Sequence, residues 1–276
     1  MLPELYRIHL SSQLNQAQLL TLEILVWLLQ VHKQVKIERL AAYFPLPIKY
    51  ESRRRHIQRL LISRAMSVTL IWLPLIENLI KLKFKPGDRV YLAIDRTQWK
   101  SNNLFVLAII YQKRAIPIYW QFLTKKGSSN LAEQQALIRP ILKALKSYEL
   151  VILGDREFKR VELAKWLKSR KLLFVLRQKK DTYIKLKGCS YQRLDSLSIV
   201  PGVKRYLTGV KVRKVNGFGQ GAIAIYWKRK YRSKMEDEPW YLLTNLPNLS
   251  EAVKADQKRA GIEAMFKDCK SGGYNE

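Results

Sequence analysis

The sequence predicts an α/β fold, in which helices flank a mixed sheet, together with an N-terminal helical region. Three observations support this prediction. Residues 1–80 carry apolar residues at helical spacing, and from residue 90 onward apolar strand-like runs alternate with helical stretches. Residues 181–246 hold short strand-like runs with glycines between them, which predicts a β-rich insertion before a last helix.

The composition describes a folded protein that binds a polyanion. With 276 residues the chain has room for one or two domains, and an apolar content of 47% excludes a disordered chain. Lys and Arg number 51 against 22 Asp and Glu, which leaves a formal net charge of +29. Such strong self-repulsion favours a nucleic acid as the partner, with a membrane surface as the competing polyanion.

Several other classes of protein do not fit. The apolar run 19–31 is too short to cross a membrane and contains Glu23, and the run 68–80 contains Pro74 and Glu77. We therefore expect no membrane partner. Two cysteines and three scattered histidines provide neither a disulfide framework nor a zinc site. The expected location is a reducing cytoplasm.

Residues 1–84 are predicted to form a helical DNA-binding region. The stretch 49–66 carries several arginines at helical spacing, and its apolar residues can face a core. The candidate DNA contacts are Arg53, Arg54, Arg55 and Arg59. A solvated basic face is the alternative, although the net charge makes phosphate contact at least as good an explanation. The preceding segment 35–52 can pair with this helix in a weak helix-turn-helix pattern.

Residues 85–276 are predicted to form the second domain, which follows a linker at 84–89. The expected order is three strands, a helix, a strand, a helix and a strand. These elements are placed at 90–95, 103–111, 115–123, 128–146, 149–155, up to 170, and 172–178. This is the order of an RNase H-like core, interrupted here by the β-rich insertion 181–246. A final helix is expected at roughly 250–270, with Asn248 as an N-cap signal.

Two aspartates come at the ends of strand-like runs in this core. Asp95 ends an apolar run that is expected to be a buried central strand, and Asp155 ends a second run. Ligands of open α/β sheets bind at the carboxyl ends of the strands, and neighbouring strands lie about 5 Å apart. The two carboxylates can therefore reach one ion. Taken singly, each aspartate is more often a cap or turn residue, and Asp155 can simply pair with Arg156.

Arg259, Glu263 and Lys270 stand at i, i+4 and i+11 of the last helix, which places them on nearly the same face. A surface salt-bridge ladder is the simplest explanation of one acid between two cations. With Asp95 and Asp155, however, Glu263 completes three acids of the kind that bind Mg²⁺. Two such ions can activate an attacking oxygen and stabilise a leaving oxygen in phosphoryl transfer.

Three segments, AIDRTQWK, LGDREFKRVELAKWLKSRKLLFVLRQ and KRAGIEAMFKDCKSGGYN, resemble bacterial insertion-sequence transposases of the DDE class. The resemblance covers roughly residues 90–276 and is greatest to the insertion-sequence-four-like branch. It implies that Asp95, Asp155 and Glu263 are the catalytic triad and hold two Mg²⁺ ions, for which Mn²⁺ can substitute. It also implies cleavage at transposon ends and strand transfer. The implied partners are double-stranded DNA, as terminal inverted repeats and target, and a second copy in a synaptic homodimer.

The helix pattern of this family is Tyr-x2-Arg-x3-Glu-x6-Lys, and it implies phosphate contacts for Arg259 and Lys270. Asp256 occupies the Tyr position, where a negative charge is expected to oppose the phosphate. Trp240 matches the tryptophan that stacks on a flipped base in the family, a contact worth about 1–3 kcal/mol. A core position on a buried strand is an equally good explanation of Trp240.

The sequence stops at SGGYNE, shortly after the last helix, whereas relatives continue into a further helical region. This difference predicts a C-terminally truncated copy. Two rival functions follow. The first is a catalytically impaired remnant that binds DNA or inhibits the full-length enzyme, and the second is an RNase H-like nuclease that cuts without joining.

Overall fold

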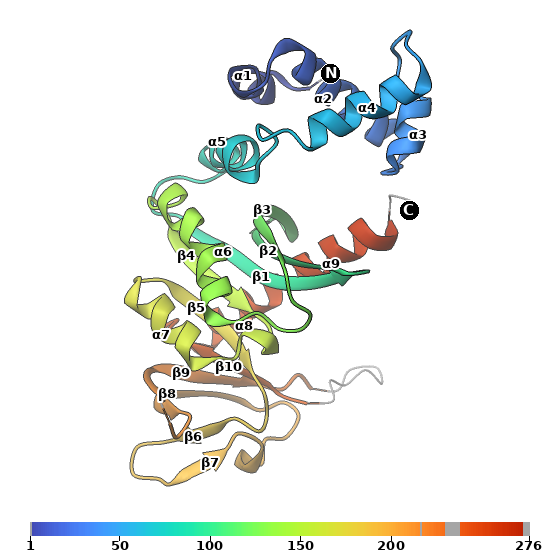
Figure 1. The fold of residues 1–276 in the computed structure, drawn as a ribbon. Helices are drawn as coiled ribbons and strands as arrows, with labels where there is room; N and C mark the ends of the chain where they lie inside the picture. Colours follow the sequence, from blue (N-terminus) through green and yellow to red (C-terminus); the bar gives the residue numbers. More distant parts are fainter. Residues whose placement is uncertain (1, 216, 230–237, 273–276) are drawn as a thin grey trace. The chain divides into compact units, whose positions relative to one another are not determined.

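The computed structural model describes residues 2–215, 217–229 and 238–272, and the chain divides into two compact units. The first unit comprises Met1–Lys85 and Ala264–Glu276, and the second comprises Pro86–Glu263. Figure 1 shows the helices of the N-terminal region in blue and the strands of the second unit in green to orange. Each unit is described by itself below.

The N-terminal part of the first unit is helical, as predicted. Asn15 begins α2 with a capping box, in which its side chain accepts a hydrogen bond from Gln18 N and the Gln18 side chain accepts one from Asn15 N. Leu28, Phe44 and Ile57 are fully buried or nearly so in one apolar cluster. The helices are α1 (Glu4–Gln13), α2 (Gln16–His32), α3 (Ile37–Ala42), α4 (Tyr50–Leu61), the π-turn η1 (Val68–Trp72) and α5 (Leu73–Lys83).

The described residues of the second unit form a ten-stranded sheet with the order β3-β2-β1-β4-β5-β10-β9-β8-β6-β7. The first three strands form an antiparallel meander, and β4 and β5 run parallel to β1. The strands of this half are β1 (Arg89–Trp99), β2 (Asn102–Tyr111), β3 (Arg114–Leu123), β4 (Glu149–Gly154) and β5 (Leu173–Gln178). The predicted α/β class and the RNase H-like order are confirmed.

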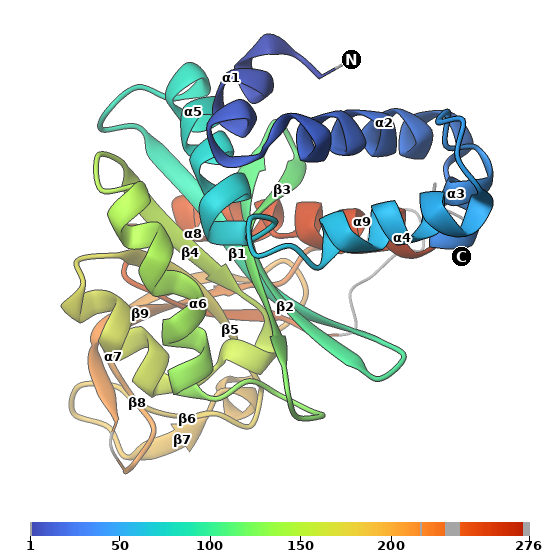
Figure 2. The same ribbon diagram turned by 45° about the horizontal axis from the view of Figure 1, so that its top comes forward.

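The central strands are buried because they are apolar on both faces. Leu92, Ala93 and Ile94 of β1 have no exposed surface, and neither do Ile152 and Leu153 of β4. Figure 2 shows α6 (Leu131–Ala144) and α7 (Val161–Ser169) in front of the sheet and α8 (Leu249–Lys258) behind it. Helices on both faces explain why these strands lack the alternation of a half-exposed sheet.

The β-rich segment predicted at 181–246 extends the same sheet. Its strand β10 pairs with β5 on one side and with β9 on the other, antiparallel in both cases. The strands are β6 (Tyr183–Lys185), β7 (Tyr191–Arg193), β8 (Lys204–Val212), β9 (Phe218–Tyr226) and β10 (Trp240–Thr244). Continuous backbone hydrogen bonding therefore joins this segment to the strands of the core.

The last helix differs from the single helix that the sequence predicts. It begins as expected, with the Asn248 side chain accepting a hydrogen bond from Glu251 N at 2.9 Å. It is then divided at Arg259 into α8 and α9 (Ala260–Lys267), and the π-turn η4 (Asp268–Gly272) follows. Among the residues described, no helix is long and apolar enough to span a bilayer.

Candidate active site

Asp95 lies on β1, and Asp155 lies directly after β4, the adjacent parallel strand. The parallel pairing of β1 with β4 ends at Ile94 opposite Gly154, and each aspartate is the next residue of its chain. Asp155 comes directly after β4, as predicted. The expectation that Asp95 ends its strand is wrong, because β1 continues to Trp99 in antiparallel pairing with β2. The juxtaposition of the two carboxyl groups does not depend on that end.

Each aspartate is oriented by a hydrogen bond from the backbone that follows it. Asp95 Oδ1 accepts from Arg96 N at 2.7 Å, and Asp155 Oδ1 accepts from Glu157 N at 2.8 Å. The second bond makes Asp155 the N-cap of the 3₁₀ turn η2 (Arg156–Phe158). The cap reading of Asp155 is thus correct for one oxygen, while the alternative pairing with Arg156 is not observed. Arg156 instead pairs with Glu238.

Arg96 and Glu157 tie the two aspartate-bearing segments together. The Arg96 guanidinium donates from Nε to both Glu157 oxygens at 3.1 Å, and from Nη1 to Asn103 Oδ1 at 3.0 Å. Glu157 Oε1 also accepts from the backbone and hydroxyl of Ser129. This half-buried network fixes the ends of β1 and β4 relative to each other. The sequence analysis did not predict this network, although the dipeptide Asp-Arg occurs at both aspartates and is a signal that points to Arg96.

The negative charges around Asp95 and Asp155 are only partly compensated by positive charge. Burial raises the pKa of Asp95 to about 6, and repulsion from Asp155 and Glu263 adds to this effect. Burial also raises the pKa of Asp155, while the charge of Arg259 opposes the rise. These interactions place Asp95, Asp155, Glu263 and Arg259 within electrostatic reach of one another, with three acids to one guanidinium.

Arg259 is the buried member of this group. It is 7% exposed, and its Nη1 donates to Glu263 Oε1 at 2.7 Å. Burial works to lower the pKa of Arg259, but the charges of Glu263 and Asp256 outweigh it and raise the pKa. Its Nε is buried and has no hydrogen-bond partner among the described residues. The predicted Arg259–Glu263 pair therefore exists, but it is not a surface ladder.

The donor set fits divalent metal ions in its chemistry. Three carboxylates supply the hard oxygen ligands that Mg²⁺ prefers, and they exceed the charge of Arg259 by two. In the described part of the chain no three His, Cys, Asp or Glu side chains are arranged to hold an ion. The pairing of Glu263 with Arg259 gives a physical reason, since it engages the acid that the other two would need.

Asp256 does not face a phosphate as expected. It is 2% exposed, and both of its oxygens accept hydrogen bonds from Arg177 of β5 at 2.7 to 3.1 Å. Its charge is therefore neutralised inside the fold. The Arg177 guanidinium also lies 4.3 Å from the centre of the Trp240 ring, and Tyr226 contacts that ring edge to face. Trp240 is partly exposed on β10, so the structure keeps both explanations of this residue open.

The remaining candidate residues lie in the first unit. Lys270 is in the π-turn η4, beyond the α-helix on which the spacing places it. On α4, Arg53 donates to Ile48 O at 2.8 Å and Arg54 pairs with Glu51 at 3.1 Å. Arg55 and Arg59 are exposed. These contacts show that Arg53 holds the turn before α4, which the sequence did not indicate.

The fold and this site define the class of the protein. It is an α/β protein of the RNase H-like type, in which Asp95 and Asp155 lie where the parallel pairing of β1 with β4 ends. The chain belongs to the Transposase DDE domain family, whose model matches residues 87–276. No curated protein matches the chain.

Among solved structures, the chain is similar to the piggyBac transposase in a synaptic complex with hairpin DNA. The TM-score is 0.51 at 14% identity, over 95% of this chain and 60% of that one. The chain thus spans less than two thirds of that transposase, and the likeness concerns the fold alone. Endonuclease V from Bacillus subtilis gives a TM-score of 0.32 at 14% identity, over 70% of this chain and 92% of that one. Argonaute from Marinitoga piezophila gives 0.31 at 13% identity, over 80% and 33%.

Proposed function

We propose that this protein is an insertion-sequence transposase of the insertion-sequence-four-like branch. It cleaves DNA at the ends of a mobile element and joins the freed end to target DNA. The observation that carries the proposal is the placement of Asp95 on β1 and of Asp155 directly after the adjacent parallel strand β4, with Glu263 in electrostatic reach of both. Membership of the family supplies the class of reaction.

Asp95, Asp155 and Glu263 would hold the divalent ions. When bound, two such ions activate the attacking oxygen and stabilise the leaving oxygen of the phosphodiester. Burial raises the pKa of both aspartates, and the nearby charge of Glu263 adds to the rise, which supports a site where a bound cation would stabilise the carboxylates. Mg²⁺ is the expected ion, and Mn²⁺ would satisfy the same oxygen ligands.

Arg259 has two roles in this proposal. In the protein alone it neutralises part of the acidic cluster through its bond to Glu263. When the carboxylates bind metal, its guanidinium would become available to the phosphate beside the cleaved bond. The buried Nε without a partner supports this second role, because an unsatisfied buried donor is costly unless a ligand accepts from it.

The DNA partner is proposed from charge. A net charge of +29 favours a polyanion, and double-stranded DNA is both the substrate and the target of the proposed reaction. Arg55 and Arg59 are exposed on α4 and can contact phosphates outside the catalytic unit. We further propose that two copies act together in a synaptic complex with the terminal inverted repeats.

A strand-transfer assay tests the proposal. Purified protein is incubated with a pre-cleaved transposon end, a supercoiled target plasmid and either Mg²⁺ or EDTA. Joined product that needs the metal supports a transposase. Nicking without joining would indicate a nuclease, and binding without either reaction would indicate a DNA-binding protein that lacks catalysis. An Asp95→Asn/Asp155→Asn double variant is the matched control for contaminating nuclease.

A further inference from the structure

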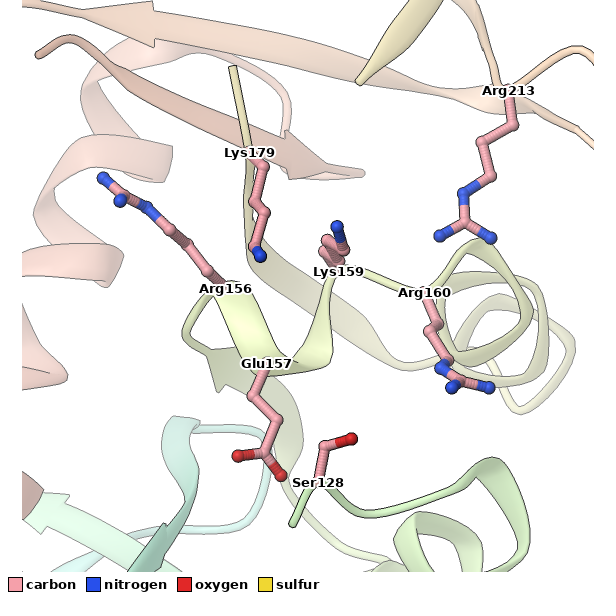
Figure 3. A pocket seen from close by; sticks show the side chains of 7 residues that line it. All are labelled: Ser128, Arg156, Glu157, Lys159, Arg160, Lys179 and Arg213. Carbon is pink, nitrogen blue, oxygen red and sulfur yellow. The ribbon is translucent and has the colours of Figure 1, made fainter. Parts of the chain in front are cut away.

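A basic hollow lies beside the candidate active site and is not part of it. Its volume is about 520 Å³, and it is lined by Ser128, Arg156, Glu157, Lys159, Arg160, Lys179 and Arg213. Arg156, which lines the hollow, directly follows Asp155 in the sequence. Figure 3 shows Lys159 between Lys179, which follows β5, and Arg213, which follows β8.

Three separate segments deliver these cations. Lys159 and Arg160 connect η2 to α7, Lys179 follows β5, and Arg213 follows β8. Arg213 is held with a positive φ of 66°, and its backbone N–H donates to Tyr183 O at 2.8 Å. The fold thus gathers positive charge from the core and from the insertion at one place, against electrostatic repulsion.

The acids near the hollow do not balance this charge. Glu157 is already engaged by Arg96, and Glu238 pairs with Arg156. Glu162 lies 3.8 Å from Arg213, at the limit of an ion pair. Among the described residues, no hydrogen bond or ion pair engages the side chains of Lys159, Arg160 and Lys179. Burial lowers the pKa of Lys159, and the neighbouring charges of Lys179 and Arg213 lower it further, although Asp181 opposes them.

The basic surface continues beyond this hollow. A second hollow of about 240 Å³ shares Lys159 and Arg213 with it and adds Asp181, Thr182, Tyr183 and Lys214, so that one acid stands among three cations there. Lys214 lies over the Tyr183 ring, 4.4 Å from its centre. In addition, α7 begins at this point without a side-chain cap, so the positive end of its dipole adds to the field. An extended row of cations suits successive phosphates of one strand.

We propose that Lys159, Arg160, Lys179 and Arg213 form a binding site for the DNA phosphate backbone, which holds the duplex next to the catalytic carboxylates. This inference rests on the proposed function, because that function supplies DNA as the substrate. The site would bind the part of the DNA that lies just outside the active site. Electrostatic contacts of this kind carry no sequence information, so the site positions the DNA without selecting it.

The test is the salt dependence of DNA binding without catalysis. Affinity for a short fluorescent duplex is measured by anisotropy in EDTA, from about 50 to 200 mM KCl. The variant Lys159→Ala/Lys179→Ala is compared with Lys143→Ala/Lys146→Ala, which removes the same charge at the far end of α6. Each lost phosphate contact reduces the slope of log K against log salt by about 0.9. We expect a slope reduced by about 1.8 in the first variant and unchanged in the second.

Equal slopes in the two double variants would overturn the site. So would binding of inorganic phosphate, followed by ³¹P NMR, with the DNA slope unchanged, because the hollow would then hold a free anion. If the double variant misfolds, Lys179→Gln alone is measured instead. We expect it to reduce the slope of log K against log salt by about 0.9. Wild-type strand transfer is scored separately. A reduced slope in the variant, with no strand transfer by the wild type, would reject the proposed function and keep this site. Strand transfer by the wild type, with an unchanged slope in the variant, would reject only the site.

Discussion

Arg177 holds Asp256 in a bidentate ion pair inside the second unit. Arg177 Nε lies 3.1 and 3.0 Å from the two carboxylate oxygens, and Nη2 lies 2.7 Å from Oδ2. The Asp256 side chain is 1% exposed. The pair joins β5 to α8, the helix that leads into Arg259 and Glu263, and therefore positions the end of the chain that carries the third acid.

Breaking this pair should destabilise the protein strongly. Arg177→Met leaves a buried carboxylate without its partner, and such losses typically cost about 3–5 kcal/mol. Equilibrium denaturation in urea measures the change. Arg193→Ala breaks the exposed pair with Asp195 and should cost no more than about 1 kcal/mol. If the two substitutions lowered the free energy of unfolding equally, the Arg177–Asp256 pair would stabilise the protein no more than an exposed pair does.

Asp155→Asn should abolish cleavage and leave DNA affinity intact. The amide keeps the side-chain shape and can still accept from Glu157 N, but it removes the anionic ligand. Since outer-shell changes at metal sites already cost about 10–100-fold, we expect a loss of at least a hundredfold. Single-turnover cleavage and anisotropy binding are measured on the same preparation. Cleavage at the wild-type rate would remove Asp155 from the mechanism.

Asp95 should make stability depend on pH in metal-free buffer. Its folded-state pKa of about 6 lies above the ordinary value of 3.8, so the folded state keeps a proton that the unfolded chain loses between these values. Its contribution to stability therefore falls as pH rises from about 4 to 6 and is constant above that. Asp95→Asn should match the wild type near pH 4 and exceed it by on the order of 2 kcal/mol at pH 7.5. Denaturation at both pH values in EDTA is the measurement, and equal stabilities at pH 7.5 would contradict it.

Lys270→Ala should weaken binding to a transposon end and reduce the salt slope by about 0.9, because one phosphate contact is lost. Binding is measured on an end fragment with Ca²⁺ in place of Mg²⁺, which prevents cleavage. Lys143→Ala is the charge-matched comparison. An unaltered slope would exclude a phosphate role for Lys270.

Gly154→Ala should disturb the site without changing any polar group. A Cβ at this position would lie 2.8 Å from Phe158 Cβ and 3.0 Å from Leu176 Cδ2, so the turn after Asp155 would have to shift. We expect a cost of about 1–3 kcal/mol and slower cleavage. Gly219→Ala on β9 meets only Lys211 Cγ at 4.0 Å and should be nearly neutral. If both variants behaved as the wild type, tight packing at Gly154 would not position Asp155.

The strands and the two aspartates were predictable from the sequence because they depend on local pattern. Apolar runs define β1 and β4, and residues that follow parallel strands meet at one edge of the sheet. The environment of Asp256 was not predictable. Its partner Arg177 lies 79 residues earlier in the chain, and only the pairing of β10 with β5 folds the two segments together. The basic hollow was not predictable for the same reason, since its lysines and arginines come from three distant segments.

The position of β10 between β5 and β9 has a mechanical consequence. The insertion is not attached by a flexible tether, because a ladder of backbone hydrogen bonds continues from the strands of the core into it. A load applied to β8 or β9 by bound DNA would be transmitted laterally to the strands that carry Asp155 and Asp95.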